Sequence, residues 1–78
     1  MNTFYGVQLD TVSEGSVSQS VYILQVLLTS LGYSLGTLDG EYGPRTKKAV
    51  LAFKKAKSLS ATDVVDMKVW NVIFNSRR

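Results

Sequence analysis

Residues 38–46 read LDGEYGPRT, and this stretch decides the fold because it forms the end of a loop between two predicted helices and the start of the second one. Pro44 suits the first position of a helix, where its missing N–H costs nothing and its fixed φ is already helical. The two glycines before it allow tight turns, and Asp39 can accept hydrogen bonds from backbone N–H groups of the same turn. We therefore predict a helix that begins at Pro44 and ends near Ala56.

The predicted helix has one apolar and one basic side. The apolar side carries four residues at helical spacing, with Thr46 beside them: Ala49, Val50, Phe53 and Ala56. The opposite side carries four lysines and an isolated leucine: Lys47, Lys48, Lys54, Lys55 and Leu51. Such a basic side is usually solvated, and the functional alternative is attraction to an anionic polymer. Nucleic acid is not expected, because no aromatic residues alternate with the lysines.

Upstream of the loop, a second helix is predicted to begin after Ser16 or Ser18 and to end at Gly32. Its inner face repeats at spacings of four, three, four and three: Val17, Val21, Leu24, Leu28 and Leu31. Tyr22, Ile23 and Val26 make a further apolar face, which a surface helix should lack. Either the N-terminal arm covers this face, or it docks a protein partner together with Leu51.

A third helix is predicted to begin near Asp66, a suitable N-cap, and to turn Val69, Trp70 and Ile73 inward. Residues 39–50 and 62–73 form a faint internal repeat of loop, cap and helix. Residues 1–14 are predicted to be an extended arm and residues 15–78 a single domain. The predicted fold is all-α: a compact three-helix bundle with long glycine-containing loops.

Composition limits the functions that are open to the chain. Among its 78 residues there is no histidine and no cysteine, which removes the commonest general base and the usual zinc ligands. The six carboxylates are scattered, so a catalytic pair is not expected. We predict a non-catalytic protein without metal or cofactor. No apolar run reaches the roughly 18 residues of a membrane span, so no membrane partner is expected.

The N-terminus lacks the basic start and apolar run of a secretory signal. The chain begins with Met1, which favours a complete protein that reaches its site without classical export over a trimmed domain.

Three motifs in fixed order give the chain a family resemblance. Residues 21–33 fit VxxLQxxLxxLGY, residues 36–46 fit GxxDGxYGxxT, and residues 49–53 fit AVxxF. This pattern resembles the peptidoglycan-binding domain family, an accessory module of cell-wall hydrolases and phage lysins. The chain departs from it at Lys54, where the family has glutamine. It departs again over residues 62–70, where the family's DGxxGxxTW has become TDVVDMKVW and only Trp70 is kept.

The resemblance implies a non-catalytic module that binds peptidoglycan, through either its glycan strand or its stem peptide. It implies a shallow groove beside the loop, lined by six residues: Tyr33, Asp39, Glu41, Tyr42, Arg45 and Thr46. Tyr42 could offer its ring to a sugar, or its ring could fill the core beneath the loop. Arg45 could pair with a stem-peptide carboxylate or be solvated. Asp39 and Thr46 are expected mainly to satisfy local backbone groups.

The resemblance implies a location at the cell wall. The missing export signal makes a phage particle a second possible location, because a virion protein is incorporated by assembly and not by secretion. The altered second loop favours an alternative function. In this alternative, the chain is a structural or adaptor protein, such as a phage virion component, that uses the same fold to dock on a protein.

Overall fold

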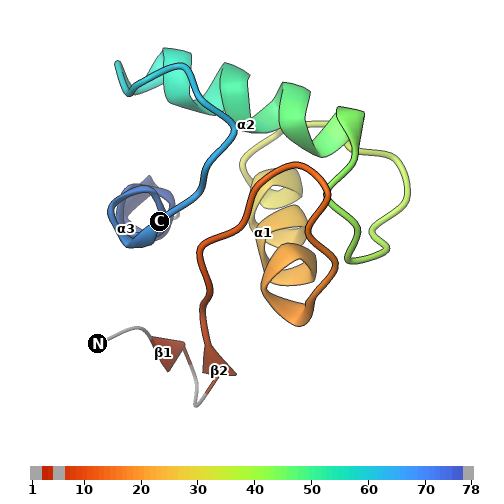
Figure 1. The fold of residues 1–78 in the computed structure, drawn as a ribbon. Helices are drawn as coiled ribbons and strands as arrows, with labels where there is room; N and C mark the ends of the chain where they lie inside the picture. Colours follow the sequence, from red (N-terminus) through yellow and green to blue (C-terminus); the bar gives the residue numbers. More distant parts are fainter. Residues whose placement is uncertain (1–2, 5–6, 77–78) are drawn as a thin grey trace.

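The computed structural model describes residues 3–4 and 7–76, and only the backbone of residues 3, 4, 7 and 8. This described part contains three helices: α1 (Gln19–Ser30), α2 (Pro44–Ala56) and α3 (Met67–Ser76). Before them, β1 (Thr3–Phe4) and β2 (Val7–Gln8) pair antiparallel, with Thr3 opposite Gln8. Figure 1 shows α2 lying across one end of α1, with α3 beside the segment that leads from β2 to α1. The prediction of a compact three-helix fold is confirmed.

Capping fixes the ends of α1. The Ser18 side chain accepts a hydrogen bond from the N–H of Val21 at 3.2 Å, so the helix begins at Gln19. Gly32 follows the C-cap with a φ of +103°, as predicted for the residue that ends the helix. The placement of Val17 on the inner face is wrong. Val17 precedes the cap, is 72 % exposed, and forms a β-bridge with Glu41.

The predicted bounds of α2 are confirmed, but the predicted position of Lys54 on a solvated side is wrong. Lys54 is only 3 % exposed, and its Nζ donates to Thr62 Oγ1 at 3.0 Å and to the carbonyl of Val64. The loop that follows α2 folds back over this side chain, which the helical period alone does not reveal. Burial lowers the pKa of Lys54, and the carboxylates of Asp66 and Asp63 partly offset this. Ala56, expected on the apolar side, is exposed.

The faint internal repeat has a structural counterpart. Both α1 and α2 carry a buried polar side chain, Gln25 and Lys54, that hydrogen-bonds to the loop leading to the next helix. After the first of these loops α2 begins at Pro44, and after the second α3 begins behind its cap, Asp66. At α3, Asp66 Oδ1 accepts from the N–H of Val69 at 3.1 Å, so the predicted cap is confirmed.

The N-terminal segment is part of the hydrophobic core. Leu9 and Val12 are buried with side chains from all three helices, and Val12 forms a β-bridge with Val65. Trp70 is fully buried, as predicted, and its Nε1 donates to the carbonyl of Asp10 at 3.0 Å. Residues 1–2 and 5–6 of the predicted arm lie outside the described residues. The domain boundary at residue 15 stays a prediction.

The second apolar face of α1 is only partly exposed. Tyr22 and Val26 are 46 % and 40 % exposed, whereas Ile23 packs against the core. Leu51, the fourth predicted docking residue, is half-buried on α2. The described residues of the arm therefore leave Tyr22 and Val26 open to solvent. Among the described helices, none is both long and apolar enough to cross a membrane.

Candidate functional site

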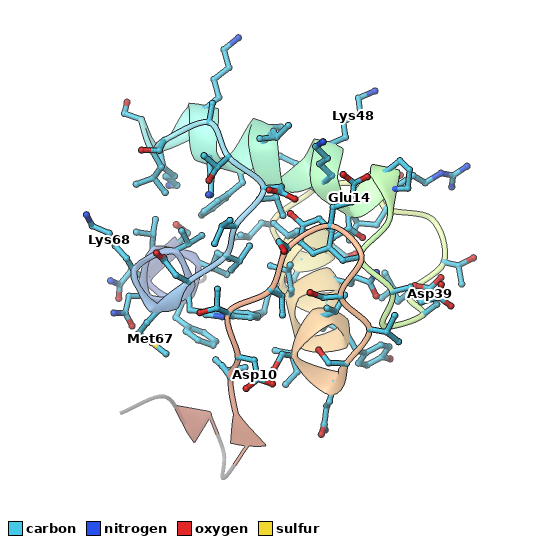
Figure 2. All side chains as sticks on the ribbon, in the orientation of Figure 1. Asp10, Glu14, Asp39, Lys48, Met67 and Lys68 are labelled. Atoms are coloured by element: carbon cyan, nitrogen blue, oxygen red, sulfur yellow. The ribbon has the colours of Figure 1, made fainter. Side chains whose placement is uncertain are left out.

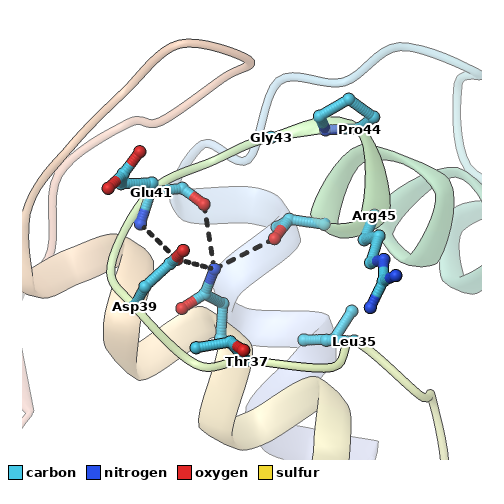
Figure 3. A pocket seen from close by; sticks show the side chains of 9 residues that line it. Leu35, Thr37, Asp39, Glu41, Gly43, Pro44 and Arg45 are labelled. Atoms are coloured by element: carbon cyan, nitrogen blue, oxygen red, sulfur yellow. Dashed lines mark hydrogen bonds between the residues drawn. The ribbon is translucent and has the colours of Figure 1, made fainter.

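Gln25 organises the loop that precedes α2. Its side chain is buried, and its Oε1 accepts from the N–H of Gly40 at 2.9 Å. Its Nε2 lies 3.0 Å from both the Glu41 carbonyl and Thr46 Oγ1, and 3.3 Å from Asp39 Oδ1. An amide nitrogen has two hydrogens, so Asp39 at the longest distance shares one of them. Figure 3 shows the three bonds of Nε2, which meet at one amide between the loop and the start of α2.

A groove lies where these residues meet, and we call it the loop groove. Its volume is about 500 Å³. It is lined by nine residues: Gln25, Leu35, Thr37, Asp39, Glu41, Gly43, Pro44, Arg45 and Thr46. Four of the six predicted ligand residues are among them, namely Asp39, Glu41, Arg45 and Thr46. Asp39, Glu41 and Arg45 are exposed, whereas Thr46 is buried and accepts the bond from Gln25.

Asp39 carries out the local role expected from the sequence. Its Oδ1 accepts from the N–H of Glu41 at 2.9 Å, which closes the turn two residues on. This hydrogen bond, followed by the one from Gln25, holds the pKa of Asp39 below its usual value of 3.8. The loop groove therefore carries an ionised carboxylate at neutral pH.

Replacement of Asp39 by asparagine tests this electrostatic contribution. Because the folded state lowers the pKa of Asp39, its contribution to stability is present above pH 3.8 and is lost as the pH falls through the lowered pKa. We expect wild type to be more stable than Asp39→Asn at neutral pH, and the difference to shrink during acidification below pH 3.8. Urea unfolding followed by circular dichroism measures the free energy of unfolding of both proteins at each pH. A difference that stays constant over this pH range contradicts the expectation.

Tyr42 does not line the loop groove. Of the two interpretations left open by the sequence, the structure shows the ring in the core, because Tyr42 is only 2 % exposed. Its hydroxyl donates to the carbonyl of Asp63, which joins the first loop to the second. Burial raises the pKa of Tyr42 above its usual 10.0, with smaller effects from Asp63 and Glu14. Its face is therefore not available for stacking on a sugar.

Arg45 separates the loop groove from a second groove, which we call the helix groove. The helix groove has a volume of about 430 Å³ and seven lining residues: Tyr33, Ser34, Gly36, Arg45, Lys48, Ala49 and Ala52. Arg45 Nη1 occupies the place that a Cβ of Gly36 would take, and the φ of +75° at that glycine also disfavours a side chain. Tyr33 lies in this second groove, edge-on to Phe53 with ring centroids 6.3 Å apart.

Comparison with known proteins identifies the family. The family model described as "Putative peptidoglycan binding domain" matches residues 17–73, which is most of the chain. The chain belongs to this family. The family match agrees with the motifs in residues 21–53. The domain itself is a binding module, and the relatives that carry it are enzymes.

Three relatives show how peptidoglycan-binding domains occur in larger proteins. The zinc D-Ala-D-Ala carboxypeptidase of Streptomyces albus G is 38 % identical over 69 residues, which cover 82 % of this chain and 26 % of that protein. The L,D-transpeptidase of Xylanimonas cellulosilytica matches with a TM-score of 0.83 and 35 % identity, over 88 % of this chain and 34 % of its own. The Burkholderia AP3 phage endolysin matches with a TM-score of 0.80 and 32 % identity, over 88 % and 26 %. The chain thus spans about a quarter of the carboxypeptidase and about a quarter to a third of the two crystallised chains.

Some residues of this peptidoglycan-binding domain were missed as site residues in the sequence. Gln25 had the clearest signal, because it is a polar residue four positions after Val21 and three before Leu28, within the apolar stripe of α1. Thr37 and Leu35 had no comparable signal, since they lie in an irregular connection. Among the described residues, no group of three or more side chains is placed to hold a metal ion.

Proposed function

We propose that the loop groove binds the stem peptide of peptidoglycan, and that this chain holds it there without carrying out chemistry. The observation that supports this is the pairing of opposite charges within one groove. Asp39 and Glu41 provide carboxylates on one side, and Arg45 provides a guanidinium on the other. A stem peptide carries both carboxylates and nitrogen donors, so it matches this arrangement better than a neutral sugar does.

The start of α2 adds donors for a carboxylate. The N–H groups of Arg45 and Thr46 lie in the first helical turn, where the helix itself offers no acceptor. Gly43, the N-cap, has no side chain to cap them. Both residues line the loop groove, and the positive end of the helix dipole favours an anion there. The guanidinium of Arg45 can add a two-point contact to the same carboxylate.

The same groove is poorly suited to the glycan strand. Protein sites that hold sugar rings by stacking use exposed aromatic faces, which offer an apolar surface with a polar edge. None of the nine residues that line the loop groove is aromatic. Stacking on a sugar was one of the two roles considered for Tyr42, and its ring is buried. These observations support recognition of the peptide part of the polymer.

Two groove variants with matched controls test the proposal. We expect Glu41→Gln and Arg45→Gln each to weaken binding of a soluble stem peptide about tenfold, because each removes one charged hydrogen-bonding partner. Glu14→Gln and Lys57→Gln make the same changes in net charge at exposed positions outside the groove and should leave binding unchanged. Isothermal titration calorimetry with the stem peptide, and separately with a glycan oligomer lacking peptides, gives the affinities.

Sedimentation with insoluble peptidoglycan separates the possible failures. A wild-type chain that stays in the supernatant refutes wall binding altogether. A chain that sediments but binds only the glycan oligomer refutes the stem-peptide assignment and keeps the wall-binding function. Equal losses in the groove variants and their controls show that net charge, and not the loop groove, controls binding.

As a peptidoglycan-binding domain, the chain is associated with the cell wall. We propose that any catalysis linked to it lies in another domain or protein, as the small covered fraction of the carboxypeptidase suggests. For a phage virion the comparisons offer no support, since the phage protein among them is an endolysin. Docking of a protein through Tyr22 and Val26 stays a prediction, supported by their exposure.

A further inference from the structure

Two grooves of opposite character meet at Arg45, and stem-peptide binding accounts for only one of them. The loop groove contains two carboxylates, whereas none of the seven residues that line the helix groove is acidic. The lining of the helix groove combines the cationic side chains of Arg45 and Lys48 with the small side chains of Ala49 and Ala52. An anionic ligand would therefore meet no repulsion from the groove lining.

The cations continue from this groove along α2. Arg45, Lys48 and Lys55 fall on one face of the helix together with Ala52, at spacings of three, four and three residues. With a rise of 1.5 Å per residue, the three charges extend over about 15 Å of the helix. All three side chains are exposed, and Figure 2 shows Lys48 pointing away from the body of the protein. We call Arg45, Lys48 and Lys55 the basic face.

Among the described residues, Arg45, Lys48 and Lys55 form no ion pair. The ion pair that the described residues form joins Lys47 to Glu14 at 3.2 Å, on another side of α2. Arg45 lies in the first turn of α2, near the positive end of the helix dipole, and that turn holds no acidic residue to offset its charge. Cations at that end lower helix stability. A bound anion would reverse this effect, so binding of an anion would stabilise α2.

We propose that the basic face binds an anionic cell-wall polymer with repeated phosphodiester groups, as a second site beside the loop groove. Three charges spread over about 15 Å match a ligand with repeated charge, because one small anion could reach only part of them. Lysine ammonium groups bind phosphate as point charges and need no two-point geometry. This site goes beyond stem-peptide binding, because Lys48 and Lys55 do not line the loop groove.

Nucleic acid carries the same phosphodiester chemistry, but the structure favours it less. Single-stranded nucleic acid is held by aromatic side chains that stack on its bases. The aromatic residue of the helix groove, Tyr33, is half-buried and lies edge-on to Phe53 at an interplanar angle of 77°. The other six residues that line the helix groove are not aromatic, and neither are the three residues of the basic face.

A pair of double variants with equal net charge tests this site. We expect Lys48→Gln/Lys55→Gln to weaken binding of a fluorescent poly(glycerol phosphate) oligomer about tenfold at about 0.15 M salt. Lys57→Gln/Lys68→Gln removes two exposed lysines outside the basic face and should weaken it less than about twofold, because at this salt charges that do not contact the polymer are screened over about 8 Å. Fluorescence anisotropy at several salt concentrations gives the affinities. Glutamine favours helix and should preserve α2.

The outcomes distinguish this site from the loop groove. Binding of the stem peptide should be unchanged in Lys48→Gln/Lys55→Gln, and binding of the phosphate oligomer should be unchanged in Glu41→Gln. Equal losses in the two double variants, or no binding of the oligomer by wild type, would overturn the second site while leaving stem-peptide binding untouched. Tighter binding of an oligonucleotide of equal charge would overturn the assignment to a wall polymer.

Discussion

Replacement of Gln25 by leucine is expected to lower the free energy of unfolding by about 3–4 kcal/mol. Leucine fills a similar volume but can neither accept from the N–H of Gly40 nor donate to the Glu41 carbonyl and Thr46 Oγ1. Each buried polar group left without a partner costs about 1–3 kcal/mol. A domain of this size has about 4–12 kcal/mol of stability in total, so the variant should lose between about a quarter and all of it.

Gln19 provides the matched control for this change. It lies on the same helix but is exposed, so Gln19→Leu should change stability by about 0.5 kcal/mol or less. Gln25→Glu adds a second comparison, because it keeps an oxygen in place but puts a carboxylate beside Asp39 and the Glu41 carbonyl. Urea unfolding followed by circular dichroism measures all three. If Gln25→Leu is as stable as Gln19→Leu, the amide does not hold the loop together.

Replacement of Tyr42 by alanine is expected to cost about 3–5 kcal/mol, as for other large aromatic side chains removed from a core. Tyr42→Phe keeps the ring and loses only the bond from the hydroxyl to the Asp63 carbonyl, which should cost about 1–2 kcal/mol. Because the ring is buried and does not line the loop groove, Tyr42→Phe should bind peptidoglycan as wild type does.

The two Tyr42 variants therefore separate a structural role from contact with the ligand. Thermal unfolding ranks their stabilities, and sedimentation with peptidoglycan measures binding of the folded protein. If Tyr42→Phe keeps its stability but no longer sediments with peptidoglycan, the Tyr42 hydroxyl contacts the ligand. The side chain would then leave its buried position when the ligand binds.

The helices could be predicted because local rules determine them. Ser18, Pro44 and Asp66 mark the starts of α1, α2 and α3, and each is a residue type with a physical reason to be there. The inward direction of Trp70 follows from its phase with Ile73. These rules depend on residues that are close together in the chain, so helix starts and buried faces can be predicted from a single sequence.

The errors arose where contacts between distant segments decide the outcome. Lys54 reads as a solvated lysine until the loop after α2 covers it and offers Thr62 and the Val64 carbonyl as partners. Val17 fits the apolar spacing of α1, but the cap at Ser18 leaves it outside the helix. For Tyr42 the sequence left two orientations open, because it lies in an irregular loop, where no period shows which way a ring points.

The candidate site was predicted as a region more successfully than as a set of contacts. The motif around residues 38–46 places Asp39, Glu41 and Arg45 at one groove. Which atoms remain free for a ligand depends on Gln25, whose bonds use Asp39 Oδ1 and Thr46 Oγ1 for the fold itself. Arg45 divides the surface into two grooves because its guanidinium lies against Gly36, which is 9 residues before it in the sequence.

The bond from Trp70 to the Asp10 carbonyl joins segments 60 residues apart, and this affects how the domain is completed during synthesis. Leu9 and Val12 leave the ribosome first but cannot be buried until α3 has emerged. The contacts of Gln25, at separations of 14 to 21 residues, can form much earlier. We therefore expect the loop to be organised before the domain is closed. A polypeptide cut short before α3 would expose its early apolar residues and would be open to aggregation and proteolysis.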